Sequence, residues 1–224
     1  TLAASGRGGV FCGAMTLLTL RQTHDGALPC GTISDAPRFG WRGQHLDCAR
    51  HFYRPATLHR LLDLMALLKL NRFHWHFADD EAFRLETVTA PDLADKTAVR
   101  GEGCLVPGVF GGGIRSGGTY SRADVAALNA HAAEVNIAIL PEIEVPGHSY
   151  ALCLARPALR DAAETGAEVS IQGYTANVVN PAKAETWDLL TPLAAEIAGM
   201  FPLRMLHLGC DELAPHTWDG SPAA

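Results

Sequence analysis

Ionisable side chains gather at four places in this 224-residue chain, and each group directly follows a short run of residues typical of a β-strand. Carboxylates, imidazoles and a guanidinium are the groups that perform acid–base chemistry in enzymes. A single charged strand end is commonplace, because strands usually turn into polar loops, but four in succession indicate a shared site. In chain order the groups are Asp47, Arg50 and His51; Asp79, Asp80 and Glu81; Glu144 and His148; and Asp211 and Glu212.

This set of side chains suits the hydrolysis of a glycosidic bond. The reaction needs a carboxylic acid that protonates the leaving oxygen and an anion that stabilises the positive charge developing on the sugar. Asp211 and Glu212 are adjacent, and two neighbouring carboxylates repel each other when both are ionised, which favours one of them keeping its proton. We therefore expect this pair to carry the chemistry.

The elements that position these groups follow a strand–helix alternation that begins at about residue 39. Strands are predicted over residues 39–47, 70–77, 136–144 and 205–209, with amphipathic helices between them. This order is typical of βα units with a parallel sheet. In a (β/α)8 TIM barrel the carboxyl ends of the strands face one rim, where catalytic residues converge. The fold class predicted is therefore α/β, a TIM barrel of which about the first four βα units are present.

Local signals define the predicted helices and the long loop. Pro55 stands near the start of the first helix, and Ser121 with Asp124 forms a capping signature for the second. Between them lies a glycine-rich connection, which lacks the Lys-Ser/Thr ending of a phosphate-binding loop and is interpreted as a plain loop. Residues 1–38 fall outside the alternation and are predicted to be the end of a preceding small α+β domain or a lead-in to the barrel. Residues 39–224 are predicted to be the first half of the catalytic barrel.

Composition excludes several classes of function. The net charge is −6, from 24 acidic residues against 18 lysines and arginines, so a nucleic-acid partner is not expected. The longest apolar runs are too short to span a bilayer. The six cysteines show no paired spacing of the zinc-ribbon or thioredoxin type, and are interpreted mainly as buried thiols. Because the chain opens on Thr1 without a signal-like segment, we expect any signal peptide to be missing or already removed.

Four sequence blocks make a family resemblance explicit. They are GQHLDCARHF at residues 43–52, KLNRFHWHFADD at 69–80, PEIEVPGH at 141–148 and HLGCDE at 207–212. In order and spacing they resemble the signature blocks of the β-N-acetylhexosaminidases of glycoside hydrolase family twenty. The resemblance covers most of the chain.

The resemblance implies an exo-acting, retaining enzyme that removes a terminal β-linked N-acetylglucosamine or N-acetylgalactosamine. In this family the acetamido oxygen of the substrate is the nucleophile, so the enzyme supplies none, and no cofactor or metal is implied. By matching position, Glu212 would be the general acid and then base, and Asp211 would orient the acetamido group. Arg50 would bind sugar hydroxyls, while Asp79 and His148 would support the acid.

Two departures from the family pattern qualify this expectation. Cys210 stands where the family usually has a second glycine, at a point where the chain must bend for both Asp211 and Glu212 to reach a sugar. The chain also ends after four predicted strands, whereas a complete barrel has eight and about 250 residues. In the family, the aromatic wall around the acetamido group and a second sugar-binding acid come from the later half. We therefore expect the chain to be a fragment, with uncertain activity of its own.

Two alternatives stay open. The first is a catalytically incomplete or degenerate sugar-binding protein. The second is a metal-dependent hydrolase of the amidohydrolase type, whose ligands would come from His74, His76, Asp79, His131, His148, His207 and Asp211. The natural glycan, the preferred sugar and the oligomeric state are not determined by the sequence. A secreted or periplasmic location is favoured by the resemblance alone.

Overall fold

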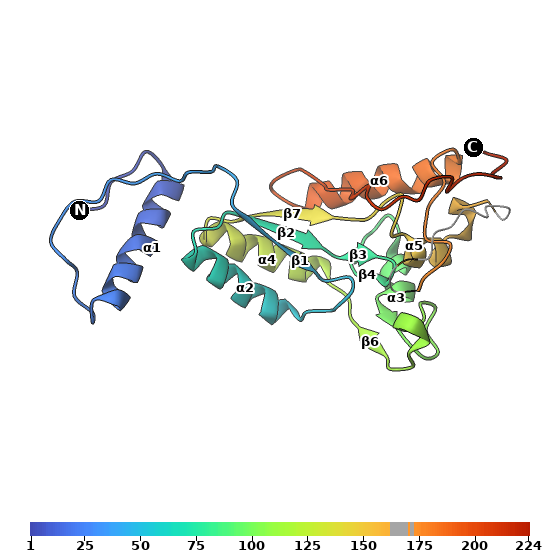
Figure 1. The fold of residues 1–224 in the computed structure, drawn as a ribbon, viewed down its shortest axis with the longest axis horizontal. Helices are drawn as coiled ribbons and strands as arrows, with labels where there is room; N and C mark the ends of the chain where they lie inside the picture. Colours follow the sequence, from blue (N-terminus) through green and yellow to red (C-terminus); the bar gives the residue numbers. More distant parts are fainter. Residues whose placement is uncertain (162–169, 171–172) are drawn as a thin grey trace.

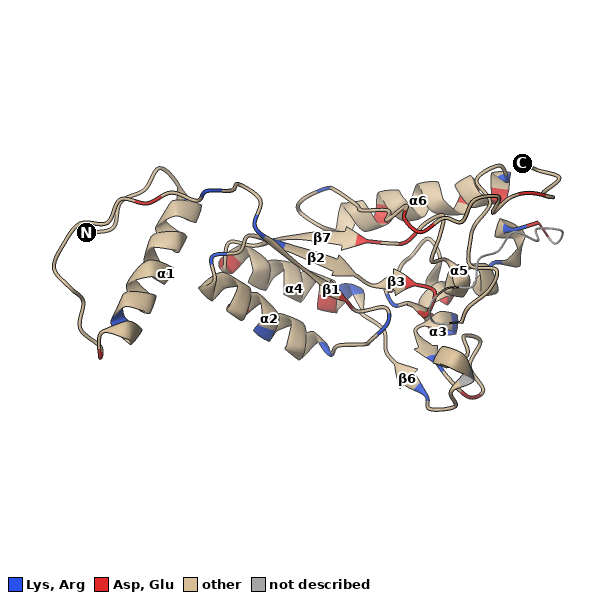
Figure 2. Cartoon of the chain, in the orientation of Figure 1, with Lys and Arg blue, Asp and Glu red and all other residues tan. Residues whose placement is uncertain are grey.

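The computed structural model describes residues 1–161, 170 and 173–224, and its central feature is a parallel sheet (Figure 1). The sheet contains β1 (Gly43–Asp47), β2 (Arg72–His76) and β7 (Ala138–Glu142), in the order β1-β2-β7. Asp47 pairs with His76, and His76 pairs with Glu142, so the carboxyl ends of the strands stand level. Figure 2 shows acidic residues at the ends of β1 and β7 and in β3. The predicted parallel α/β arrangement is confirmed, although each strand is shorter than predicted.

The connections contain further helices and two small antiparallel hairpins. The hairpins pair β3 (Ala78–Asp79) with β4 (Ala82–Phe83), and β5 (Val99–Arg100) with β6 (Ser116–Gly117). The helices are α1 (Arg7–Thr23), α2 (Pro55–Leu67), α3 (Pro91–Thr97), α4 (Arg122–Glu134), α5 (Tyr150–Ala155) and α6 (Ala184–Met200), with short 3-10 turns at Val109–Gly111 and Pro157–Leu159. Part of the predicted plain loop therefore has secondary structure.

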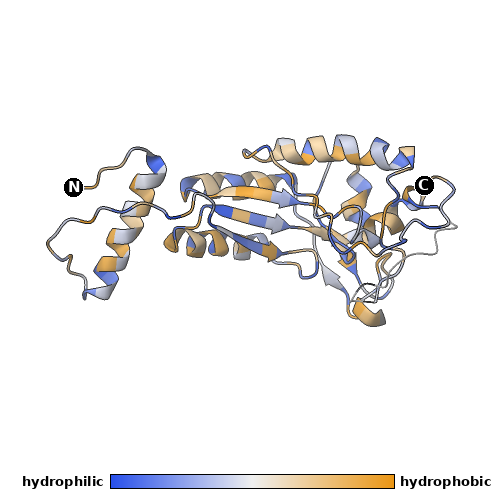
Figure 3. Cartoon of the chain, turned by 45° about the horizontal axis from the view of Figure 1, so that its top comes forward, coloured by the Kyte–Doolittle hydropathy of each residue, from blue (hydrophilic) through white to orange (hydrophobic). Residues whose placement is uncertain are grey.

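The helices next to the sheet begin where their sequences predict. Pro55 is the first residue of α2, where its missing N–H costs no hydrogen bond. Ser121 caps α4: its hydroxyl accepts the Asp124 N–H, and the Asp124 carboxylate accepts the Ser121 N–H. Figure 3 shows hydrophobic segments along β7 and on the neighbouring helices. The two local signals thus placed both helix starts correctly.

The main core lies on one face of the sheet. Along β2, Phe73 and Trp75 are completely buried, and Trp75 packs edge-on against Tyr120 with ring centroids 4.8 Å apart. The alternate residue His74 is only partly buried, because successive side chains of a strand point to opposite faces. Burial of Phe73 and Trp75 therefore directs His74 and His76 to the opposite face.

The predicted strand over residues 205–209 is wrong as a regular strand. Among the described residues, His207 alone in that stretch forms a bridge, which is parallel to Glu142 of β7. His207 N–H donates to Pro141 O at 2.9 Å, so the chain does lie beside β7. Left-handed backbone at Arg204 (φ 54°) and Gly209 (φ 67°) bounds the extended run on both sides, and this prevents a longer ladder.

The N-terminal segment forms a helix that the strand–helix alternation did not predict. Helix α1 has no buried residue, and Figure 1 shows it at the end of the molecule where the sheet strands begin. Arg7 of this helix donates to Ala133 O at 3.1 Å, Thr16 accepts from Lys69 at 2.7 Å, and Phe11 packs against the core. Within the described ranges, no helix has the length and apolar character needed to cross a bilayer.

Candidate active site

Arg50 is positioned by the loop that leaves β1. The Asp47 carboxylate accepts the backbone N–H groups of Ala49 and Arg50 at 3.0 and 2.9 Å, which folds the loop into a tight turn. The Arg50 guanidinium then lies 3.2 Å from Asp47, 3.0 Å from Asp79 and 3.6 Å from Glu81. Burial by itself lowers the pKa of Arg50, but the three carboxylates outweigh it and raise the pKa above its ordinary value. Arg50 is therefore a fixed cation at the rim.

Glu81 beside it is a buried acid with no exposed surface. Burial, with the nearby Asp79 charge, raises its pKa to about 7. It was noted in the sequence only as one of several charges after β2.

Asp79 lies at the centre of the site and is buried. Its Oδ2 is 2.9 Å from His76 Nε2, and its Oδ1 is 3.3 Å from His148 Nδ1. Burial would raise the pKa of Asp79, but contacts with His148, His76 and Arg50 hold it well below its ordinary value. Asp79 is thus an anion held between three cationic partners.

His148 connects Asp79 to Glu212. It lies in the loop after β7, which Ser149 stabilises by donating to Glu144 O at 2.9 Å. His148 Nε2 is 3.2 Å from Glu212 Oε2, while its Nδ1 faces Asp79 and, at 3.6 Å, Asp80. Hydrogen bonds to Asp79 and Asp80 raise the pKa of His148 to about 11. Four of the five residues singled out in the sequence, Arg50, Asp79, His148 and Glu212, therefore form one connected group.

Asp211 reaches this edge through an abrupt bend. Gly209, Cys210 and Glu212 all have left-handed backbone, with φ values of 67°, 70° and 50°. The bend interrupts the strand alternation that would otherwise send Asp211 and Glu212 to opposite faces. A side chain at Gly209 would place its Cβ 1.7 Å from Glu144 Oε2, so the Glu144 carboxyl group would have to move if another residue replaced this glycine. Asp211 and Glu212 are both exposed at the rim.

Glu144 is a buried acid next to the bend. Burial raises its pKa to about 8, and the charges of Asp211 and Glu142 add to this effect. At neutral pH it therefore keeps its proton in the folded chain.

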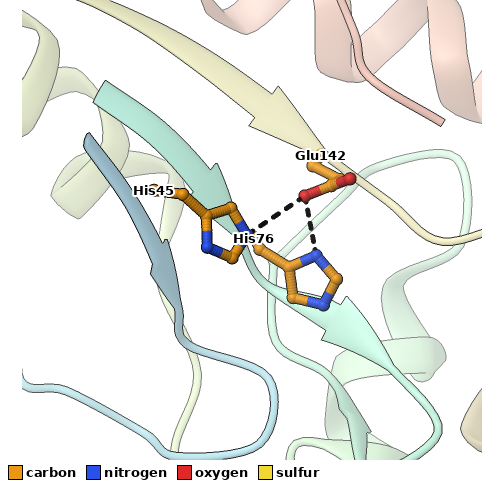
Figure 4. Close-up of side chains that lie close together, drawn as sticks. All are labelled: His45, His76 and Glu142. Carbon is orange, nitrogen blue, oxygen red and sulfur yellow. Dashed lines mark hydrogen bonds and ion pairs between the residues drawn. The ribbon is translucent and has the colours of Figure 1, made fainter. Parts of the chain in front are cut away.

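A second polar cluster lies deeper on the same face, centred on Glu142. Glu142 Oε2 is 2.7 Å from His76 Nδ1 and 3.6 Å from His45 Nε2 (Figure 4). The same oxygen is 2.8 Å from His74 Nε2, and Glu142 Oε1 is 2.6 Å from His207 Nδ1. The spacing His74-x-His76 indicated two imidazoles on one strand face, and they do lie there. The position of Glu142 between them was not anticipated, because it depends on the register of β2 against β7.

The metal-site alternative can be compared with these distances. Three groups have ligand atoms within 4.8 Å of one another: His45, His76 and Glu142; His74, Glu142 and His207; and Asp79, Asp80 and His148. Two ligands bound tetrahedrally at roughly 2.0–2.1 Å from zinc lie about 3.3–3.4 Å apart. The contacts of 2.6–2.8 Å from Glu142 to three of its histidines are shorter than this, and the contact with His76 is a hydrogen bond. His131, another ligand in that alternative, pairs instead with Asp63 at 2.8 Å.

Comparison with known proteins identifies the class and then the family. A crystal structure titled as a GH20 exo-β-N-acetylglucosaminidase from Vibrio harveyi in complex with N-acetylglucosamine superposes with a TM-score of 0.85 at 36% identity, covering 96% of this chain and 35% of that one. The fold is therefore a TIM-barrel-like α/β fold. Residues 39–224 match the model of the glycosyl hydrolase family 20 catalytic domain, and the chain belongs to that family.

Curated relatives agree with this assignment. The β-hexosaminidase of Vibrio furnissii is 40% identical over 98% of this chain, and that of Akkermansia muciniphila is 36% identical over 99%. The chain spans 36% and 44% of the length of these two relatives.

Proposed function

We propose that this chain is the part of an exo-acting, retaining β-N-acetylhexosaminidase that carries its acid–base groups. It would act on terminal, non-reducing β-linked N-acetylglucosamine or N-acetylgalactosamine. Residues 39–224 would supply the first four βα units of the catalytic barrel, preceded by residues 1–38 as a lead-in. Family membership supports this proposal over a metal-dependent hydrolase.

The observation that carries the proposal is the contact of His148 Nε2 with Glu212 Oε2 at 3.2 Å, with Asp79 behind His148 at 3.3 Å. A general acid needs a partner that holds its carboxyl group in one orientation. Glu212 is exposed on its outer side, where a glycosidic oxygen can approach it. In the proposed mechanism, Glu212 donates a proton to the leaving oxygen and then accepts one from the attacking water.

Asp211 and Arg50 would act directly on the sugar. Asp211 would hold the substrate's acetamido group so that its oxygen attacks the anomeric carbon, and its negative charge would stabilise the cyclic cation that forms. Arg50, held by three carboxylates, would donate hydrogen bonds to sugar hydroxyls. Asp79 and His148 would act on Glu212 and not on the substrate.

The test compares variants on two substrates with different leaving groups, in the natural full-length protein. We expect Glu212→Gln to lower kcat for N,N′-diacetylchitobiose by roughly 10²–10⁴-fold. The loss should be smaller for the p-nitrophenyl β-N-acetylglucosaminide, since nitrophenolate departs with little help from an acid. Glu134→Gln is the matched control, because that glutamate is exposed on α4. Equal activity of the Glu212→Gln variant and the control would reject Glu212 as the acid.

Asp211→Asn tests the role of the acetamido group. It should lower turnover of the p-nitrophenyl N-acetylglucosaminide much more than that of the p-nitrophenyl glucoside, which has no acetamido group to orient. Equal losses on both substrates would contradict the substrate-assisted mechanism. Binding of N-acetylglucosamine without turnover by the unmodified protein would instead support a degenerate sugar-binding protein.

A further inference from the structure

The two polar clusters form one continuous chain of alternating carboxylates and imidazoles. Starting from Glu212 it runs through His148, Asp79 and His76 to Glu142, with successive separations of 3.2, 3.3, 2.9 and 2.7 Å. His207 follows Glu142 at 2.6 Å. The inner end of the chain is drawn in Figure 4, where His76 points at Glu142. The strand register therefore links the proposed acid to a histidine on β2 that has no direct contact with it.

His76 is the buried member on which this linkage depends. Its side chain is 5% exposed, and its two nitrogens contact different carboxylates, Nε2 facing Asp79 and Nδ1 facing Glu142. An imidazole can satisfy two carboxylates in this way only when both nitrogens carry protons, because each oxygen is an acceptor. Burial lowers the pKa of His76, but the two carboxylates outweigh it and raise the pKa to about 10. His76 is therefore an imidazolium at neutral pH.

Further titratable groups face His76 from the elements that pack against it. Glu144 Oε1 is 3.9 Å from His76 Nδ1, and the His45 ring centroid of β1 lies 5.5 Å from that of His76. Arg50 lies 3.0 Å from Asp79 Oδ2, the same oxygen that His76 contacts. The groups that face His76 are Asp79 from β3, Glu142 and Glu144 from β7 and the residues after it, and His45 from β1.

We propose that His76, held between Asp79 and Glu142, is a positioning residue that controls the charge and orientation of the chain ending at Glu212. This role rests on the proposed function of Glu212. By binding Asp79 Oδ2, His76 turns Oδ1 of the same carboxylate toward His148. His76 carries a positive charge and Glu142 a negative one, and Asp79 still faces His76 when Glu142 is removed, so removing either residue changes the net charge behind His148 by one, in opposite directions. His207 and His74 add close contacts to Glu142, at 2.6 and 2.8 Å.

The two charge changes have opposite signs, and this provides a test. The value of kcat/KM for the p-nitrophenyl N-acetylglucosaminide is measured against pH with the natural full-length protein. His76→Gln removes a positive charge, so the deprotonation that ends activity at high pH becomes harder, and the alkaline limb should move up by on the order of one pH unit. Glu142→Gln removes a negative charge and should move the same limb down. His131→Gln, a histidine on α4 paired with Asp63, is the control and should leave it in place.

A purely structural role of His76 would lower the rate without moving the limb, and limbs shifted in the same direction by both variants would overturn the proposal. Ring NMR signals of His148, followed against pH in the same variants, provide a readout that needs no activity. His76→Gln should raise the midpoint of the His148 titration and Glu142→Gln should lower it. If the unmodified protein is inactive, the proposed function fails, while these signals still decide the linkage. Should His76→Gln fail to fold, the shape-conserving Glu142→Gln decides it alone.

Discussion

The two faces of β2 hold their side chains by different physical means. Phe73 and Trp75 lie on the face that forms the core, and both are completely buried among apolar and aromatic side chains. His74 and His76 alternate with them on the other face and contact Glu142 at 2.8 and 2.7 Å. On the first face, any apolar side chains of suitable volume would bury similar area. On the second face, each group depends on the charge and orientation of particular neighbours.

This difference shows how one five-residue strand supplies both the fold and the candidate site. Burial of apolar area is non-directional and sums over many contacts. Burial of a carboxylate is costly unless particular cations or hydrogen-bond donors contact it. The apolar face should therefore respond to loss of volume, and the polar face to loss of charge.

The largest expected effect comes from breaking the apolar face. Trp75→Ala should lower the free energy of unfolding by about 3–5 kcal/mol, because it leaves a cavity where the indole packs against Tyr120 and Phe201. His74→Ala, its neighbour on the other face, is the matched control and should cost much less, since His74 is 24% exposed. Urea denaturation followed by circular dichroism measures both. Equal losses would mean that the two faces are not distinct in packing.

A smaller effect is expected from the polar face, and it depends on pH. The folded pKa of Glu144 is raised to about 8 from an ordinary 4.5, so the folded chain binds more protons than the unfolded chain between these values. The stabilising contribution of Glu144 is thus fully present below about pH 4.5 and is lost as the pH rises through 8. Glu144→Gln should reduce the fall in unfolding free energy between pH 5 and 8 by on the order of 2 kcal/mol.

Urea titrations at the two pH values test this, with Glu134→Gln on α4 as the exposed control. An unchanged pH dependence in Glu144→Gln would show that this carboxyl group titrates normally in the folded chain.

The smallest effect is expected at the bend that presents Asp211. Cys210 has a φ of 70°, a conformation that costs a residue with a side chain about 1 kcal/mol relative to glycine. Cys210→Gly should therefore raise the free energy of unfolding by about 1 kcal/mol or less, because it also removes the contact of Sγ with Val145 O at 3.2 Å. Gly209→Ala should act in the opposite direction, since its Cβ would collide with Glu144. Thermal melts compare the two variants, and a stabilised Gly209→Ala would contradict the bend.

Local sequence signals succeeded where the interaction they report is itself local. Pro55 and the Ser121–Asp124 box mark helix starts that the structure confirms, since capping involves residues within one turn. The prediction of a regular strand over residues 205–209 failed because strand pairing does not depend on local composition alone. That stretch has a strand-like composition, but pairing was limited by left-handed backbone at Arg204 and Gly209. A positive φ angle at a non-glycine residue such as Arg204 has no clear signal in the sequence.

The residues of the candidate site also divide into those nominated from the sequence and those found only in the structure. The residues at the strand ends, Arg50, Asp79, His148, Asp211 and Glu212, were nominated from their positions and from the family resemblance. Their roles remain predictions that the proposed variants test. Glu142 and His76 were not assigned to the site, because their contact joins residues 66 positions apart.

The sequence by itself determined the parallel α/β alternation, the helix starts and the set of ionisable groups at the strand ends, because periodicity and capping act over a few residues. Tertiary structure alone decided which of those groups touch. The register of β1, β2 and β7 brings carboxylates and imidazoles from distant segments to within 2.7–3.6 Å of one another. Their charges and proton positions follow from that proximity, since electrostatic and hydrogen-bond energies depend on distances that no single segment of the chain contains.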